Sequence, residues 1–229
     1  MAELKDILSY GIDDDVIRNL LKIAEQLDSY SQMVPMHRTN DYVGLVVKRL
    51  LHYLSKETNA AVLCFRVDIH AFAWRVRNVF EGVLLLEHVT KNKNSAEAFI
   101  AQKIGDEKTI LESLLSLGSS AAENTSPIRE RIDKANAVLR KHGFEKTPPW
   151  RTDFLAISAG LKYEYDAFYK LYSKYVHPSA WTILSDADEY ETIQYWEIFL
   201  VQVQLHSQHA LACAEAFLST RGEFVRKNG

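Results

Sequence analysis

The sequence contains few residues that interrupt helices, with only 9 glycines and 5 prolines among its 229 residues. Apolar residues recur instead at steps of three and four, which is the period of one helix face. Hydrophobic residues make up 47% of the chain, enough to form a substantial core. The sequence therefore predicts an all-α fold, an antiparallel helical bundle with long central helices and a helical insertion.

An excess of charge of either sign is also missing, since 27 basic and 30 acidic residues give a formal net charge of -3. This balance gives no general reason to expect binding to nucleic acid or to an anionic membrane. The N-terminus has no basic region followed by an apolar run, and the apolar stretch 198–218 is interrupted by glutamines, histidines and a glutamate. We therefore expect a cytoplasmic protein without a signal peptide or a membrane span.

Motifs for common cofactors and metals are lacking as well, including the P-loop, Gly-x-Gly-x-x-Gly, HExxH and the Glu-x-x-His of di-iron bundles. His206 and His209 have the spacing of helical ligands, but the only acidic residue near them in sequence is Glu215, so we interpret them as surface histidines. Cys64 and Cys213 lie in apolar stretches, which favours buried, reduced thiols. We expect no metal and no cofactor.

The helical patterns fit a single domain over residues 1–229. It comprises N-terminal helices in 1–56, core helices in 57–90 and 150–180, a polar helical excursion in 95–147 and a C-terminal helix in 188–220. Within these segments we predict individual helices at about 13–30, 40–55, 59–88, 95–117, 127–142, 151–177 and 188–220. Ser126 and Pro127 suit a helix start, and Gly143 suits a helix end.

A strip of polar side chains falls within an arc of about 60° on the predicted 59–88 helix. Its members are Arg66, His70, Arg77, Glu81 and His88. The strip borders an apolar face, where charged groups need partners. It can be structural, with Arg77 pairing with Glu81 at i,i+4, or it can be one wall of a polar pocket.

A second polar line follows the predicted 151–177 helix at every fourth residue. It consists of Tyr165, Tyr169, Ser173 and His177, with Tyr172 adjacent. Hydroxyls and an imidazole on one face can bind a polar ligand or assist acid–base chemistry. The alternative is a tyrosine-rich packing face whose hydroxyls bind neighbouring groups.

Two stretches of the chain resemble the bacterial domain of unknown function 5677. The first is similar to its Arg-x-x-x-Glu signature and reads Arg77-Asn78-Val79-Phe80-Glu81. The second is similar to its downstream signature and includes Trp150, Gly160-Leu161, Tyr165, Tyr169 and the run Tyr172-Ser173-Lys174-Tyr175-Val176-His177-Pro178-Ser179. Together they cover about residues 60–180. The resemblance implies a helical fold and no established activity.

Members of this family are also similar in outline to helical HEPN-type proteins. Many of those are ribonucleases, or their inactive relatives, in phage-defence and toxin systems. Their nuclease motif is an arginine followed, after four to six residues, by a histidine at a helix start. Arg66 and His70 are separated by only three residues, and Arg77 has no histidine at that distance.

These patterns lead to one candidate site. If the two polar helices meet, a pocket would be lined by Arg77, Glu81, Tyr169, Ser173 and His177, with His70 as a further candidate. We favour a binding or sensing module in which an arginine takes a small anionic or polar ligand. An enzyme would use His177 as acid or base and Arg77 to stabilise charge, with Glu81 as its orienter and Ser173 or Tyr169 as hydrogen-bond partner. The alternative function is a HEPN-like ribonuclease or a phage-defence or toxin-type protein, with RNA as the partner. A homo-oligomeric interaction protein with no small-molecule site is the third hypothesis, and whether the chain is an enzyme stays open.

Overall fold

The computed structural model describes residues 13–35, 41–92, 94–117, 125–144 and 150–221. The all-α prediction is confirmed: the regular structure of these residues is helical, and no strand occurs among them. They form two compact units, one from residues 1–91 and 151–229 and the other from residues 92–150. No helix in the described ranges is both long enough and apolar enough to cross a membrane.

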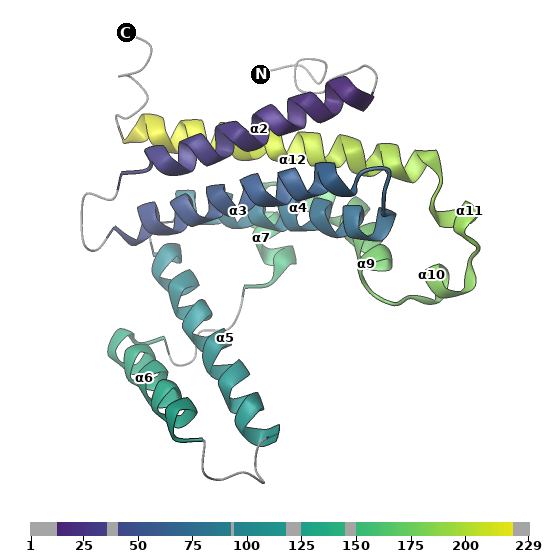
Figure 1. The fold of residues 1–229 in the computed structure, drawn as a ribbon. Coiled ribbons are helices and arrows are strands. Elements are labelled where there is room, and N and C mark those ends of the chain that lie inside the picture. Colours follow the sequence, from purple (N-terminus) through teal and green to yellow (C-terminus); the bar gives the residue numbers. More distant parts are fainter. Residues whose placement is uncertain (1–12, 36–40, 93, 118–124, 145–149, 222–229) are drawn as a thin grey trace. The chain divides into compact units, whose positions relative to one another are not determined.

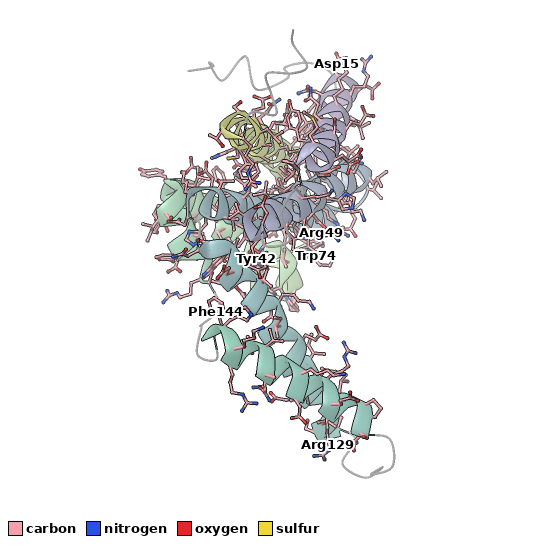
Figure 2. The ribbon with its side chains drawn as sticks, turned by 90° about the vertical axis from the view of Figure 1, so that its left-hand side faces the viewer. Asp15, Tyr42, Arg49, Trp74, Arg129 and Phe144 are labelled. Carbon is pink, nitrogen blue, oxygen red and sulfur yellow. The ribbon has the colours of Figure 1, made fainter. Side chains whose placement is uncertain are left out.

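The first unit is built on four long helices. They are α2 (Asp13–Met33), α3 (Tyr42–Cys64), α4 (Ile69–Lys91) and α12 (Ile193–Thr220), which pack side by side (Figure 1). Each helix buries one apolar stripe, as its sequence period requires. Figure 2 shows charged residues such as Asp15 and Arg49 on the outside of this unit. The core lies between the four helices and also includes buried side chains from residues 152–176, such as Tyr172.

The chain reverses between α3 and α4, where the sequence predicts one uninterrupted helix over 59–88. The first helix ends at Cys64, and the carboxylate of Asp68 accepts a hydrogen bond from the Ala71 amide at 3.0 Å to start the next. Arg66 lies in this turn with φ of 60°, in the left-handed region. The prediction of a single helix was therefore wrong, and Arg66 leaves the predicted polar strip to pair with Asp13.

The predicted 151–177 helix is also divided. Gly160, with φ of 76°, ends α7 (Thr152–Ala159), and the chain continues through α8 (Lys162–Glu164) and the π-helix η2 (Tyr165–Tyr169) into α9 (Lys170–Val176). Glycine adopts this left-handed conformation without the steric cost that a side chain brings. Both α7 and α9 pack on α4, which brings the second polar line to the first.

Two short helices precede the last long one. They are α10 (Ala180–Leu184) and α11 (Ala187–Tyr190), so the C-terminal helix begins at Ile193 and not at 188. The Tyr175 hydroxyl donates to the Tyr190 carbonyl at 2.7 Å and thereby connects this segment to α9.

The second unit is a pair of packed helices, α5 (Ser95–Leu117) and α6 (Ser126–His142). These bounds confirm the predictions for 95–117 and 127–142 to within a residue. Gly143 ends α6 with φ of 71°, as its position indicated, but the N-cap is Thr125 and not Ser126. Figure 2 labels Arg129 near the start of α6 and Phe144 just after its end.

Candidate polar ligand site

Three side chains of the first unit meet around the guanidinium of Arg77. Its Nε donates to Glu81 Oε1 at 2.9 Å, its Nη2 donates to the Tyr169 hydroxyl at 2.7 Å, and its Nη1 lies 3.2 Å from His177 Nε2. The Tyr169 hydroxyl in turn donates to Glu81 Oε1 at 3.0 Å. Arg77, Glu81, Tyr169 and His177, here called the Arg77 cluster, thus combine residues from both predicted polar lines.

The donor and acceptor roles within the Arg77 cluster follow from the chemistry of its groups. A guanidinium has donors and no acceptor, so His177 Nε2 must accept from Arg77 Nη1. This requires a neutral imidazole with its proton on Nδ1. The structure therefore assigns one tautomer of His177, with the Nδ1 proton directed away from Arg77.

Local helix geometry brings these residues together. Arg77 and Glu81 lie one turn apart on α4, the spacing at which side chains on a helix meet. Tyr169 is the last residue of the π-helix η2, and an extra residue in a helical turn changes the direction of the side chains that follow. His177 has an extended backbone, φ of -114° and ψ of 146°, just before Pro178, which cannot continue a helix.

The cluster is partly buried and carries opposite charges. The side chain of Arg77 is 16% exposed and that of Glu81 33%, whereas His177 is exposed. Burial opposes the charge of Arg77, but the hydrogen bond and charge of Glu81 outweigh burial and raise the pKa of the guanidinium above its ordinary value. Burial likewise raises the pKa of Tyr169. Near neutral pH, the cluster therefore holds a charged arginine and a protonated tyrosine.

The other two predicted site residues make different contacts. The Ser173 hydroxyl donates to the Tyr169 backbone carbonyl at 2.9 Å, one helical turn back. His70 Nδ1 lies 2.9 Å from the Tyr175 carbonyl oxygen and donates to it, which holds α4 against α9. Their role in ligand binding stays a prediction.

His88, the last member of the predicted strip, lies at the other end of α4. Its ring centroid is 6.0 Å from that of Phe154, and burial lowers its pKa. The members of the strip thus contact different partners along the helix, because α7 and α9 cover different parts of α4.

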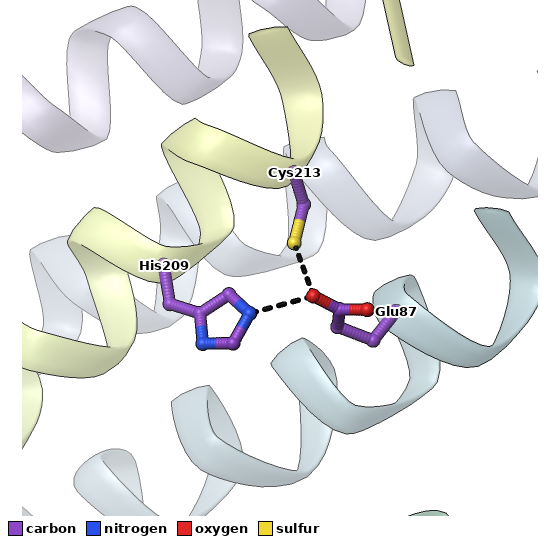
Figure 3. A group of neighbouring side chains, drawn as sticks. All are labelled: Glu87, His209 and Cys213. Carbon is purple, nitrogen blue, oxygen red and sulfur yellow. Dashed lines mark hydrogen bonds and ion pairs between the residues drawn. The ribbon is translucent and has the colours of Figure 1, made fainter. Parts of the chain in front are cut away.

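Sequence reasoning missed a second polar cluster, formed by Glu87, His209 and Cys213 (Figure 3). Glu87 Oε1 lies 2.7 Å from His209 Nε2 and accepts from Cys213 Sγ at 3.2 Å. The interpretation of the two histidines as surface residues was wrong, because His206 is only 4% exposed and His209 contacts this carboxylate. In the sequence, this cluster could have been suspected from the i,i+4 spacing of His209 and Cys213, which places them on one helix face. No residue pattern near Glu87 indicated that it would join them.

The fold and the Arg77 cluster define a class: an all-helical protein in which an arginine is held by side chains from two packed helices. The chain belongs to a family of unknown function, DUF5677, whose model matches residues 59–192. All four residues of the Arg77 cluster lie within that range. No curated protein and no solved structure matches the chain.

Proposed function

We propose that the protein is a binding or sensing module and that the Arg77 cluster takes the anionic group of a small ligand, such as a phosphate. The observation that supports this most is an arginine held by three partners, one of which is the exposed His177. A guanidinium that is already oriented loses less conformational entropy on binding than a free one. Arginine also presents paired donors that match the oxygens of phosphate or carboxylate.

The donors of Arg77 are only partly used inside the protein. The three contacts of its nitrogens with Glu81, Tyr169 and His177 use at most three of the five N–H groups of a guanidinium. Two N–H groups of the guanidinium are then left for the proposed ligand. The Nδ1 proton of His177 provides a further donor.

Glu81 influences which anions the Arg77 cluster can select. Its carboxylate neutralises Arg77, so the cluster does not attract anions by net charge alone. Selectivity must then come from hydrogen-bond geometry, which favours a group with several acceptor oxygens over a spherical anion such as chloride. The competing interpretation is that Arg77 has a purely structural role and stabilises the packing of α9 on α4. In that case no anion should bind at the Arg77 cluster.

Calorimetric titration with inorganic phosphate separates these two interpretations. We expect saturable binding at one site, and we expect Arg77→Lys to weaken it at least about tenfold, because lysine keeps the charge but loses the planar donor pairs. His177→Gln should weaken binding less, since glutamine can still donate. Arg75→Lys is the matched control, because Arg75 lies on the same helix and pairs with Glu57.

If the wild-type chain and Arg77→Lys have equal affinity for phosphate, the cluster only holds α4 and α9 together and is not the binding site. Circular dichroism and thermal unfolding of each variant show whether lost binding reflects lost folding. A loss confined to Arg77→Lys and His177→Gln, in folded proteins, supports the site.

A ribonuclease is the second candidate function, and the contact between Arg77 and His177 favours it. The HEPN-type spacing is missing along the sequence, but the fold places His177 Nε2 3.2 Å from an arginine nitrogen. In such an enzyme the contact of His177 Nε2 with Arg77 would open, and Nε2 would then remove the proton of an RNA 2′-hydroxyl. The 2′-oxygen would attack phosphorus, and the 5′-oxygen would leave with a proton from water. Arg77 would stabilise the charge on the phosphoryl oxygens.

Cleavage of mixed RNA tests this candidate, with Arg77→Ala as the control preparation. The ribonuclease proposal requires cleavage by the wild-type chain that the variant loses. Phosphate binding without such a difference would leave the chain as a binding module only.

A further inference from the structure

We propose that Glu87, His209 and Cys213 form a site for a divalent transition metal ion of the zinc class. The inference is independent of the Arg77 cluster, because it uses other residues on α4 and α12. A carboxylate oxygen, an imidazole nitrogen and a thiolate sulfur are the three donor types that zinc takes from proteins. Two of them, His209 and Cys213, lie one helical turn apart on α12, and Glu87 faces them from α4 (Figure 3).

The donor atoms are close enough to share one ion. Glu87 Oε1 is 2.7 Å from His209 Nε2 and 3.2 Å from Cys213 Sγ, and all three donor atoms lie within 4.8 Å of one another. Around a tetrahedral zinc ion, such atoms are separated by about 3.4–3.6 Å, given the usual bond lengths. Small rotations of the side chains are therefore enough to open the hydrogen bonds and admit the ion.

The helices that carry the donors are fixed by the core. α4 and α12 pack directly on each other, and Glu87 itself is 9% exposed. The His209 side chain is 28% exposed, so an ion can reach the donors from solvent. Ligands on rigid packed helices keep their spacing better than ligands on loops. Three protein donors leave one tetrahedral position for water.

Metal binding requires one of the three groups to be ionised already and the other two to give up a proton. The hydrogen bond from His209 is the largest of the contacts that lower the pKa of Glu87 to about 2, so the carboxylate is ionised near neutral pH. Burial and Glu87 raise the pKa of Cys213, which keeps the thiol protonated in the absence of metal. The incoming ion would displace this proton to solvent and form the metal–thiolate bond. The proton that His209 Nε2 donates to Glu87 would move to Nδ1, which frees Nε2 to bind the ion.

A nucleophilic role for Cys213 fits the geometry less well. Its sulfur donates to a carboxylate, which disfavours the thiolate, and His209 contacts Glu87 and not the sulfur. The nearby ammonium of Lys91 pairs with Glu87 Oε2, and its side chain is 54% exposed. Lysine can therefore turn toward solvent when a cation enters, which removes the repulsion between the two positive charges.

Titration of the full chain with Zn²⁺ against a chelator of known affinity, and with Co²⁺ as an absorbing substitute, tests the site. We expect one equivalent to bind, and Co²⁺ to give the absorption band of a thiolate ligand. Cys213→Ser should abolish that band and weaken Zn²⁺ binding at least about tenfold, as should His209→Gln. The chain has just two cysteines, so Cys64→Ser is the matched thiol control, and His142→Gln is the matched histidine control.

Both control variants should bind Zn²⁺ with the affinity of the wild-type chain. Circular dichroism confirms that each variant is folded before its affinity is compared. The proposal is overturned if Co²⁺ gives no thiolate band in the wild-type chain, or if folded Cys213→Ser binds Zn²⁺ as tightly as Cys64→Ser.

Discussion

Between about pH 7.5 and pH 4.5, the free energy of unfolding of the wild-type chain is expected to fall by about 3 kcal/mol more than that of His206→Gln. The reason is the environment of His206, which is 4% exposed. Burial is the largest cause that lowers its pKa from 6.5 to about 3, and the charge of His209 adds to it. The imidazole therefore stays neutral in the folded protein throughout this pH range.

The sign follows from proton binding. Below pH 6.5 the unfolded chain takes up a proton at His206 that the folded chain does not, so acid favours the unfolded state. The stability from this group is fully present above pH 6.5 and is lost as the pH falls toward the folded value near 3. Each pH unit within that window costs about 1.4 kcal/mol. His206 lies against Phe80 and Tyr172, which cannot stabilise its charge as a carboxylate would.

Urea unfolding at several pH values measures this difference. Other groups contribute to the acid sensitivity of both proteins, including His88, and the comparison with His206→Gln removes their share. His142 is exposed on α6, so His142→Gln should keep the wild-type pH dependence. Parallel pH profiles for the wild-type chain and His206→Gln would mean that His206 is not buried as a neutral imidazole.

Replacement of Tyr172 by alanine is expected to destabilise the protein by about 3–5 kcal/mol. Tyr172 is completely buried on α9, with ring centroids 6.4 Å from Phe80 and 5.9 Å from Phe199. Alanine would remove a large apolar volume between α4, α9 and α12 and leave a cavity. Tyr172 therefore anchors the helix that precedes His177.

Tyr172→Phe separates the ring from its hydroxyl. The hydroxyl lies 3.5 Å from His206 Nε2, a long and weak contact, so phenylalanine should cost about 1 kcal/mol or less. Chemical denaturation of both variants gives the two free energies. If Tyr172→Ala were no less stable than Tyr172→Phe, the packing of α9 in this core would be incorrect.

The fold class followed from sequence because helical periodicity is a local property. The scarcity of glycine and proline, the apolar stripe of α2, and the start and stop signals of α6 at Ser126-Pro127 and Gly143 were enough to predict these helices. The breaks were harder to predict, since the apolar pattern continues through Cys64 to Ile69 while the backbone turns. Asp68 as a capping residue and Gly160 as a helix stop were the local signals that mark these turns.

The Arg77 cluster could be predicted only in part. The i,i+4 spacing indicated the pairing of Arg77 with Glu81. The position of Tyr169 depends on a π-helical turn, which no residue pattern predicted. The approach of His177 depends on how α9 packs on α4, which is a tertiary property. Glu87 was missed for the same reason, because its partners lie more than a hundred residues later in the sequence.

The most direct test of the account is a nitrogen–proton NMR titration of the full chain with inorganic phosphate, observing the arginine Nε–H signals. Arg77→Lys identifies the Arg77 signal by its loss. Arg75, which lies on the same helix as Arg77 and pairs with Glu57 of α3, provides the internal reference. We predict that phosphate shifts the Arg77 signal saturably and leaves that of Arg75 in place. An unchanged Arg77 signal at saturating phosphate, or equal shifts for both arginines, would contradict the proposal that the Arg77 cluster is an anion site.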